Sequence, residues 1–187
     1  MEIHWGDACQ FYITPTGARE VCVVVISGDS HLRLDDALPR FPELAARLDG
    51  APRVTPERGA ISATRRLERV TRGHVALIGD ASGSVDAITG EGICLLFQQA
   101  AALGDALAAG NLASYEARHR QLRKRPARMA DLMLLLDRRT GLRRRAVRAL
   151  AAHPDLFARM LAMHVRGDPL VSYFVNTFSL GWRLLTL

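Results

Sequence analysis

Apolar positions near the amino terminus predict β-strands. Residues 3–13 and 20–27 have strand-like patterns and are joined through residues 14–17, Thr-Pro-Thr-Gly, where a tight turn is natural. Residues 21–26 form an uninterrupted apolar run, so we expect the second strand to be covered on both faces. Because a lone hairpin is marginally stable in water, these strands need further structure to pack against.

A shorter apolar run covers residues 75–78 and ends at Gly79-Asp80. A buried strand of this kind delivers a turn and a carboxylate to its carboxyl end, where ligands bind in open α/β sheets. Ten residues further on, Thr-Gly-Glu-Gly at 89–92 opens a helix expected over residues 91–109. Its first N–H groups and positive dipole end favour anionic or electron-rich ligand atoms, and its glycines allow close approach. The segment therefore predicts a cofactor site.

A purely structural explanation of this segment uses the same residues. Thr89 is then an N-cap near a helix start, and Glu91 is an acid in a first helical turn, where any helix favours one. We expect Asp86 to be a loop or capping carboxylate rather than a catalytic one. One observation counts against a structural explanation of the whole segment. A strand, a turn, a glycine pair and an alanine-rich helix all occur together in it.

Helical patterns follow both strand regions. Residues 32–48 have apolar residues at helical spacing interrupted by Pro39 and Pro42, which predicts one helix or two short ones. Residues 59–63 predict a short extended segment that returns toward the cofactor site. The two arginines that follow, Arg65 and Arg66, are expected to form a solvated basic edge.

Beyond residue 111 the pattern is helical, and Pro126 is expected to kink or divide the helix. Two later helices are expected over residues 154–166 and from residue 170 toward the end, separated by Gly-Asp-Pro at 167–169. Apolar residues of the first of these are expected in the core rather than in a substrate tunnel: Phe157, Met160, Leu161 and Met163.

The charge of the 187-residue chain is unbalanced, with a net charge of +6. It permits attraction to nucleic acid, acidic phospholipid or diphosphate-bearing substrates. The basic helices lack interleaved aromatic residues and a recognisable nucleic-acid module, so we expect no nucleic-acid partner. Apolar helices beside arginines are compatible with peripheral membrane contact. No apolar run is long enough to span a membrane and no leader is evident, so we expect a cytoplasmic protein, with a membrane-peripheral location as the alternative.

The cysteines and histidines support neither a metal site nor a hydrolase. Cys9, Cys22 and Cys94 show no Cys-x-x-Cys or metal pattern, so we expect a reduced protein without a metal. A hairpin turn at residues 15–16 would place Cys9 opposite Cys22, which permits a disulfide without predicting one. The six histidines are dispersed and have no triad neighbours in sequence, so no catalytic residue is assigned.

Through the segment from Gly79 to Ile93 and its helix, the chain resembles FAD-dependent oxidoreductases of the para-hydroxybenzoate hydroxylase-like superfamily, and within it the geranylgeranyl reductase family. The shared pattern is an apolar strand, Gly-Asp-Ala, a few small residues, an aspartate, and Thr-Gly-Glu-Gly-Ile before a helix. One departure is Ala87, where the family often has proline, which makes this loop less rigid.

The resemblance implies FAD binding. Asp80 would accept a hydrogen bond from a ribityl hydroxyl, and the backbone from Gly90 to Ile93 would approach the pyrimidine edge of the isoalloxazine. The implied cofactor-binding residues are Gly79, Asp80, Ala81, Thr89, Gly90, Glu91, Gly92 and Ile93. Residues 10–15 look like the substrate-side motif of the family, imperfectly matched. They imply Tyr12 and Pro15 as substrate-side residues, with plain packing as the alternative for Tyr12.

The dinucleotide-binding half of such a site has no counterpart in the sequence. No strand followed by Gly-x-Gly-x-x-Gly and a helix precedes His74. We expect the chain to be the carboxyl-terminal part of a larger flavoprotein whose N-terminal cofactor domain is missing here. The alternative is a natural remnant with another role.

These patterns predict an α+β fold in three regions. Residues 1–66 would supply antiparallel strands of a substrate domain, residues 67–110 a flavin-facing strand-turn-helix unit, and residues 111–187 a helical region. The fold would be an incomplete FAD/NAD(P)-binding one. The expected activity is hydride transfer to a carbon–carbon double bond or, alternatively, oxygen insertion, using FAD, NAD(P)H or another reductant, and a hydrophobic small-molecule substrate. The alternative function is a non-enzymatic helical module that binds a partner.

Overall fold

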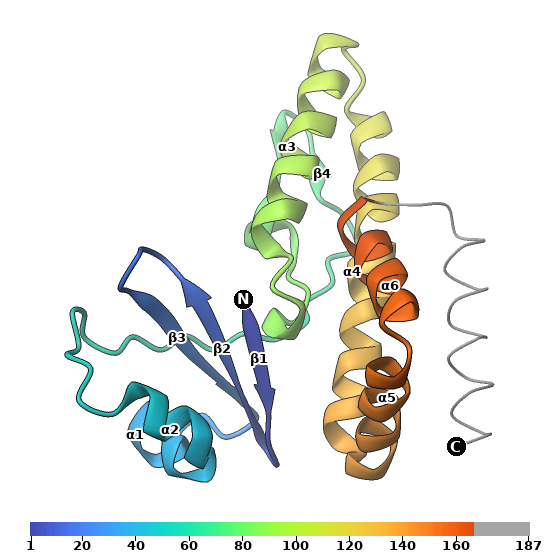
Figure 1. Ribbon diagram of the computed structural model, residues 1–187. Helices are drawn as coiled ribbons and strands as arrows, with labels where there is room; N and C mark the ends of the chain where they lie inside the picture. The colour runs from blue at the N-terminus through green and yellow to red at the C-terminus, as the bar shows by residue number, and fades with distance from the viewer. Residues whose placement is uncertain (167–187) are drawn as a thin grey trace. The chain divides into compact units, whose positions relative to one another are not determined.

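The computed structural model describes residues 1–166 of the chain and has an α+β fold, as the sequence predicts. It forms two compact units, Met1–Leu134 and Leu135–Leu187. The first unit contains a β-sheet and the predicted cofactor segment, and the second contains helices (Figure 1). The division into regions 1–66, 67–110 and 111–187 stays a prediction.

The amino-terminal sheet has three antiparallel strands in the order β1 (Glu2–Trp5), β2 (Cys9–Pro15) and β3 (Val21–Ser27). The prediction of one strand over residues 3–13 was wrong, because a turn at Gly6 divides it. The Gly6 N–H donates to the Cys9 carbonyl over 3.1 Å. A Cβ on Gly6 would lie 2.4 Å from the Phe41 ring, so glycine is needed at this turn.

The register of β2 and β3 separates the two cysteines that the sequence placed opposite each other. Cys9 pairs with Ser27, and Cys22 pairs with Thr14. The turn is longer than predicted, since the Thr16 N–H donates to the Glu20 carbonyl. Both cysteines are free thiols.

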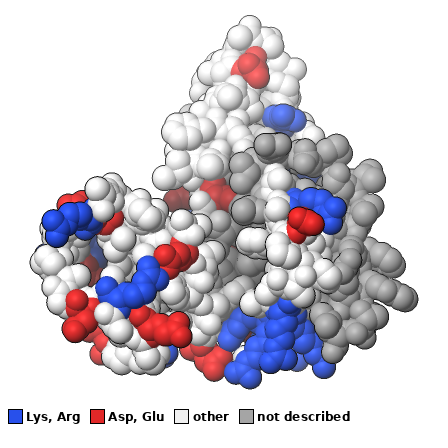
Figure 2. Space-filling view, in the orientation of Figure 1, with Lys and Arg blue, Asp and Glu red and all other residues white. Residues whose placement is uncertain are grey.

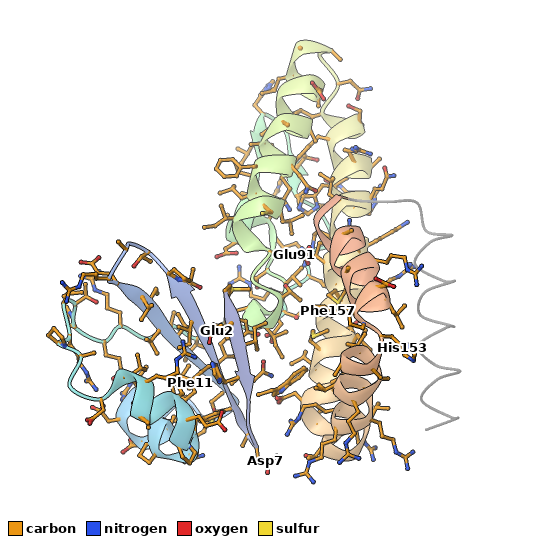
Figure 3. All side chains as sticks on the ribbon, viewed as in Figure 1. Glu2, Asp7, Phe11, Glu91, His153 and Phe157 are labelled. Carbon is orange, nitrogen blue, oxygen red and sulfur yellow. The ribbon has the colours of Figure 1, made fainter. Side chains whose placement is uncertain are left out.

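Only one face of β3 is covered, so the prediction that both faces would be buried was wrong. Val23 and Val25 pack on the core that contains Phe11 and Leu44, whereas Val24 is 44% exposed. Phe11 points from β2 toward the helices (Figure 3). Its ring packs edge-to-face with the Phe41 ring, and the two ring centroids are 4.9 Å apart.

Three short helical segments cover that face, as the interrupted pattern of residues 32–48 predicts. They are α1 (Leu34–Ala37), the 3₁₀ helix η1 (Leu38–Arg40) and α2 (Pro42–Leu48). Pro42 occupies the first position of α2, where its missing N–H costs nothing. Beyond α2, residues 51–69 are exposed and form no helix or strand, so the extended segment expected at 59–63 pairs with no sheet.

The strand predicted at 75–78 is shorter and more exposed than expected. β4 (Thr71–Arg72) and β5 (Val75–Ala76) form a two-stranded hairpin. Val75 is 61% exposed, so this is not the buried strand that the apolar run predicts. The chain continues as half-buried Leu77 and Ile78, which pack with Val70 against the helices that follow.

Two long helices follow this hairpin and confirm the helical patterns. α3 (Gly92–Ala108) matches the helix predicted over 91–109, and a link of three residues separates it from α4 (Leu112–Arg138). The link is built by Gly110, which has a positive φ of 63°, and Asn111, whose side chain accepts from the Ala113 N–H. Pro126 lies inside α4 and does not divide it.

The second unit, over its described part, contains α5 (Thr140–Ala152) and α6 (Pro154–Arg166). Ala149 and Leu156 form its small core, and His153 lies at the junction of the two helices (Figure 3). Phe157 is 50% exposed, so its predicted core position was wrong.

The side chains of Met160, Leu161 and Met163 lie outside what the structure describes, as does the helix expected from residue 170. Within residues 1–166, no helix has the length and apolar character needed to cross a membrane.

Candidate functional site

The Gly79-Asp80-Ala81 sequence forms the start of a 3₁₀ turn, η2 (Gly79–Ser82), directly after Ile78. Gly79 has a positive φ of 56°, a conformation that side chains other than glycine rarely adopt. Asp80 and Ala81 are exposed, while Ser82 is fully buried. The turn therefore presents a carboxylate on its outer side and a hydroxyl toward the protein interior.

Both backbone groups of Gly79 are held by buried side chains. The Gly79 N–H donates to Gln99 Oε1 of α3 over 2.7 Å, and the Ser82 hydroxyl donates to the Gly79 carbonyl over 2.7 Å. His119 Nε2 of α4 lies 2.9 Å from the Ser82 hydroxyl oxygen. We assign the proton of the neutral His119 ring to Nε2, with His119 as the donor, because the Ser82 hydroxyl donates its one proton at its shorter contact, to the Gly79 carbonyl. We call Ser82, Gln99 and His119 the inner triplet.

Burial lowers the pKa of His119, and the nearby positive charges of Arg123 and Arg120 lower it further, although Glu116 opposes them. The histidine therefore stays neutral near pH 7 and serves as a hydrogen-bond donor within the packed interior. The Tyr115 ring meets the His119 ring edge-on, with centroids 5.7 Å apart. His119 is thus fixed on one side by an aromatic ring and on the other by Ser82.

Arg123 holds the loop that follows the turn. Its guanidinium donates to the carbonyls of Ser82 (3.1 Å), Ser84 (3.0 Å) and Arg65 (2.7 Å). Burial, and then the charge of Arg66, lower the pKa of Arg123, but a guanidinium keeps its charge in proteins. The backbone of residue 65 and the Arg123 side chain can approach this loop closely because residue 83 is glycine. A Cβ on Gly83 would lie 2.6 Å from the Arg65 carbonyl oxygen.

The extended segment after residue 60 does return to this loop, as the sequence predicts. The Arg65 N–H donates to the Ser84 carbonyl over 3.0 Å, and the Ser84 hydroxyl donates to the Ala63 carbonyl. Arg65 and Arg66 have exposed side chains, as expected for a basic edge. Residues 63–65 therefore lie along the loop through backbone contacts.

The predicted residues at the start of α3 follow a second 3₁₀ turn, η3 (Ala87–Thr89). Asp86 caps this turn by accepting from the Ile88 N–H over 3.1 Å, which confirms its predicted capping role. Gly90 has a positive φ of 67° and redirects the chain into the helix. Glu91 occupies the N-cap position of α3 (Figure 3), so Thr89 is not its N-cap residue.

The first helical residues, Gly92 and Ile93, are exposed. Because an α-helix leaves its first N–H groups without partners inside the helix, this end of α3 can offer backbone donors to a ligand. The positive end of the helix dipole adds to that attraction. The helix thus begins within the predicted segment, and contact of residues 89–93 with a cofactor stays a prediction.

Of Tyr12 and Pro15, the two residues predicted to lie on the substrate side, only Tyr12 lies at this loop. Tyr12 is buried, and its hydroxyl donates to the Ile88 carbonyl over 2.7 Å. Pro15 is exposed at the end of β2. Residues three apart in a strand face opposite sides, so these two side chains cannot line one pocket from β2.

The inner triplet and Arg123 were not predicted as a site. The signal was present in α4, where Tyr115, His119 and Arg123 recur every four residues and so lie on one helical face. Their partners are backbone carbonyls and a serine, which have no distinctive sequence pattern. Tyr115 also donates to the Leu77 carbonyl over 2.7 Å, which fixes the segment that enters the turn.

A surface hollow of about 530 Å³ lies along the β4–β5 hairpin. Its lining residues include none of the predicted cofactor residues: they are Arg69, Val70, Thr71, Arg72, Val75 and Leu77. Among residues 1–166, no three His, Cys, Asp or Glu side chains come together as metal ligands. Comparison with protein-family models, curated proteins and solved structures finds no match to the chain.

Proposed function

We propose that the chain supplies the flavin-contacting part of an FAD-dependent oxidoreductase. One observation carries the proposal: an exposed carboxylate at Asp80 and the exposed start of α3 belong to one loop whose backbone is fixed from the interior. Rigid presentation of this kind lowers the entropic cost of binding a ligand. The fold proposed to surround it is a substrate-side sheet, a strand-turn-helix unit and a helical region.

In this proposal each exposed group has a distinct task. Asp80 accepts a hydrogen bond from a ribityl hydroxyl of FAD, and its charge strengthens that bond. The backbone from Gly90 to Ile93 meets the pyrimidine edge of the isoalloxazine, where the helix dipole favours negative charge. Gly79 contributes by allowing the turn that presents Asp80, and the remaining proposed contacts are made by Ala81, Thr89 and Glu91.

FAD, when bound, supplies the redox chemistry, either hydride transfer to a carbon–carbon double bond or oxygen insertion. NAD(P)H or another reductant and a hydrophobic small-molecule substrate complete the proposed reaction. Tyr12 contributes by holding the Ile88 carbonyl, which fixes the loop just before Gly90. It is therefore proposed as a positioning residue on the substrate side.

The test is a titration of the purified chain with FAD, followed by flavin fluorescence and the visible absorption band. We expect saturable binding that Asp80→Ala weakens about 10- to 100-fold, because a hydrogen bond to a charged group contributes about 1.5–3 kcal/mol when both partners are well placed. Asp105→Ala is the matched control, since Asp105 is an exposed carboxylate near the other end of α3. Equal affinity of the two variants would count against the site.

A second candidate function is a non-enzymatic module that binds a partner through its helices. The exposed apolar side of α3 favours it: Ile93 is 69% exposed, Phe97 68% and Leu107 61%. At 100° per residue these three positions share one face of the helix. Absence of FAD binding by a chain that circular dichroism shows to be folded would favour this candidate over the flavin proposal.

A further inference from the structure

The second unit contains a segment that is rich in arginine and has no acidic residue. Residues 138–152 contain six arginines and neither aspartate nor glutamate. Five of the six are exposed: Arg138, Arg139, Arg144, Arg145 and Arg148. No ion pair is formed by any of these five within the part of the chain that the structure describes. Figure 2 shows the resulting area of positive charge on the surface.

Helical geometry gathers three of these side chains on one side of α5. Arg144 and Arg148 are one turn apart, and Arg145 lies about 100° around the axis from Arg144. The opposite side of α5 is buried through Arg143 and Ala146. We call Arg144, Arg145 and Arg148 the arginine face. Such a cluster repels itself, so it is stabilised by an anionic partner.

The chemistry of the cluster fits phosphate groups. All of its cations are guanidinium groups, which bind phosphate oxygens through two parallel hydrogen bonds, whereas an ammonium acts as a point charge. Small aliphatic residues share this side of the helix: Ala151 and Ala152 lie two turns beyond Arg144 and Arg145, and both are exposed. A side with basic and small aliphatic residues suits a phospholipid headgroup layer.

Nucleic acid fits this surface less well. Residues 138–152 contain no aromatic side chain on which a base could stack. We infer that the arginine face of α5 is a docking surface for anionic phospholipid membranes. This inference goes beyond the proposed flavin function and does not depend on it.

The test is sedimentation of the full chain with phosphatidylcholine vesicles that contain 0 or about 30% phosphatidylserine. We expect binding to the anionic vesicles alone, weakened by added salt because screening shortens the range of the charges. The triple variant R144Q/R145Q/R148Q should bind about a hundredfold more weakly, since each basic residue near an anionic surface contributes about fivefold in affinity.

The matched control is R19Q/R40Q/R58Q, which removes the same charge from exposed arginines of the first unit. It should bind the anionic vesicles nearly as well as the unaltered chain, and circular dichroism should show that both variants are folded. Equal losses in the two triple variants would overturn the inference, because total charge alone would then explain binding. Absence of vesicle binding, or tighter binding to a 20-base oligonucleotide at the same salt concentration, would overturn it as well.

Discussion

Ser82 shows how one small side chain can connect distant parts of a chain. Its hydroxyl donates to Gly79 three residues earlier and accepts from His119 on α4. A serine surrounded by glycine and alanine in a loop has no sequence signature for this role. The bonding depends on α4 bringing a histidine to the same place, which is a tertiary contact. The sequence-based set of site residues therefore contained residues on the exposed side of the turn and none of the inner triplet, and the cofactor contacts of that set stay a prediction.

The neutral state of His119 predicts a pH-dependent stability. Burial holds the pKa of His119 in the folded chain below its ordinary value of 6.5, so the unfolded chain takes up a proton first as the pH falls. Neutral His119 makes its full contribution to the free energy of unfolding above about pH 6.5, and this contribution is lost as the pH falls toward the pKa of His119 in the folded chain. Urea unfolding should therefore have a lower midpoint at pH 5.5 than at pH 7.5.

His119→Gln keeps a side-chain N–H donor but cannot take up a proton, so its midpoint should change less between these two pH values. The control is His74→Gln, at an exposed position in the β4–β5 turn, and it should retain the pH dependence of the unaltered chain. The same pH dependence in the His119 variant would show that other groups cause it.

At the scale of elements, the sequence predicted helices better than strands. α3 was predicted because Gly90 and Gly92 mark its start and an alanine-rich run of residues follows. The interrupted helices around Pro39 were predicted for a similar local reason. Strand boundaries depend on partners instead: residue 6 divides the first strand because the Phe41 ring occupies the space where a side chain would lie.

The loop after η2 provides a test of close packing at the element scale. Gly83 has a positive φ of 98°, and its Cβ would lie 2.6 Å from a backbone carbonyl oxygen. Gly83→Ala should therefore destabilise the protein by about 2–4 kcal/mol, through backbone strain and displacement of Arg123. Gly90→Ala should lower the free energy of unfolding by only about 1–2 kcal/mol. The φ of Gly90 is also positive, but no neighbouring atom lies within 4 Å of the position that its Cβ would take.

Gly104→Ala is the control for both variants, since it lies within α3 with open space around it and should stabilise the helix by about 1 kcal/mol. Unfolding in urea, monitored by circular dichroism, measures all three changes. Equal effects of Gly83→Ala and Gly90→Ala would show that Arg123 does not hold the loop tightly.

At the scale of the whole molecule, the long irregular segment 51–69 is the most exposed connection in the first unit. It is held at its start by the Arg53–Asp35 ion pair and near its end by the Arg65 N–H. Limited trypsin digestion should therefore cut first after Arg58, between these attachments, because proteases act on exposed chain that can extend into their active site. Mass spectrometry of early fragments identifies the cut.

The Arg58→Gln variant is the control, and it should lose that first fragment pair while other cuts keep their rates. An earlier cut within α4 or α5 would mean that those helices open more readily than the segment 51–69.

The hydrogen bonds at Gly79 also have a consequence for how this sequence can vary. Because its N–H and carbonyl are both engaged by the inner triplet, neither is open to a ligand, and in the proposed function selectivity depends on Asp80 and the start of α3. The inner and outer sides of the turn are thus under separate constraints. Exchanges on the outer side can alter what is bound without disturbing the fold, while an inner exchange requires a compensating one in another helix.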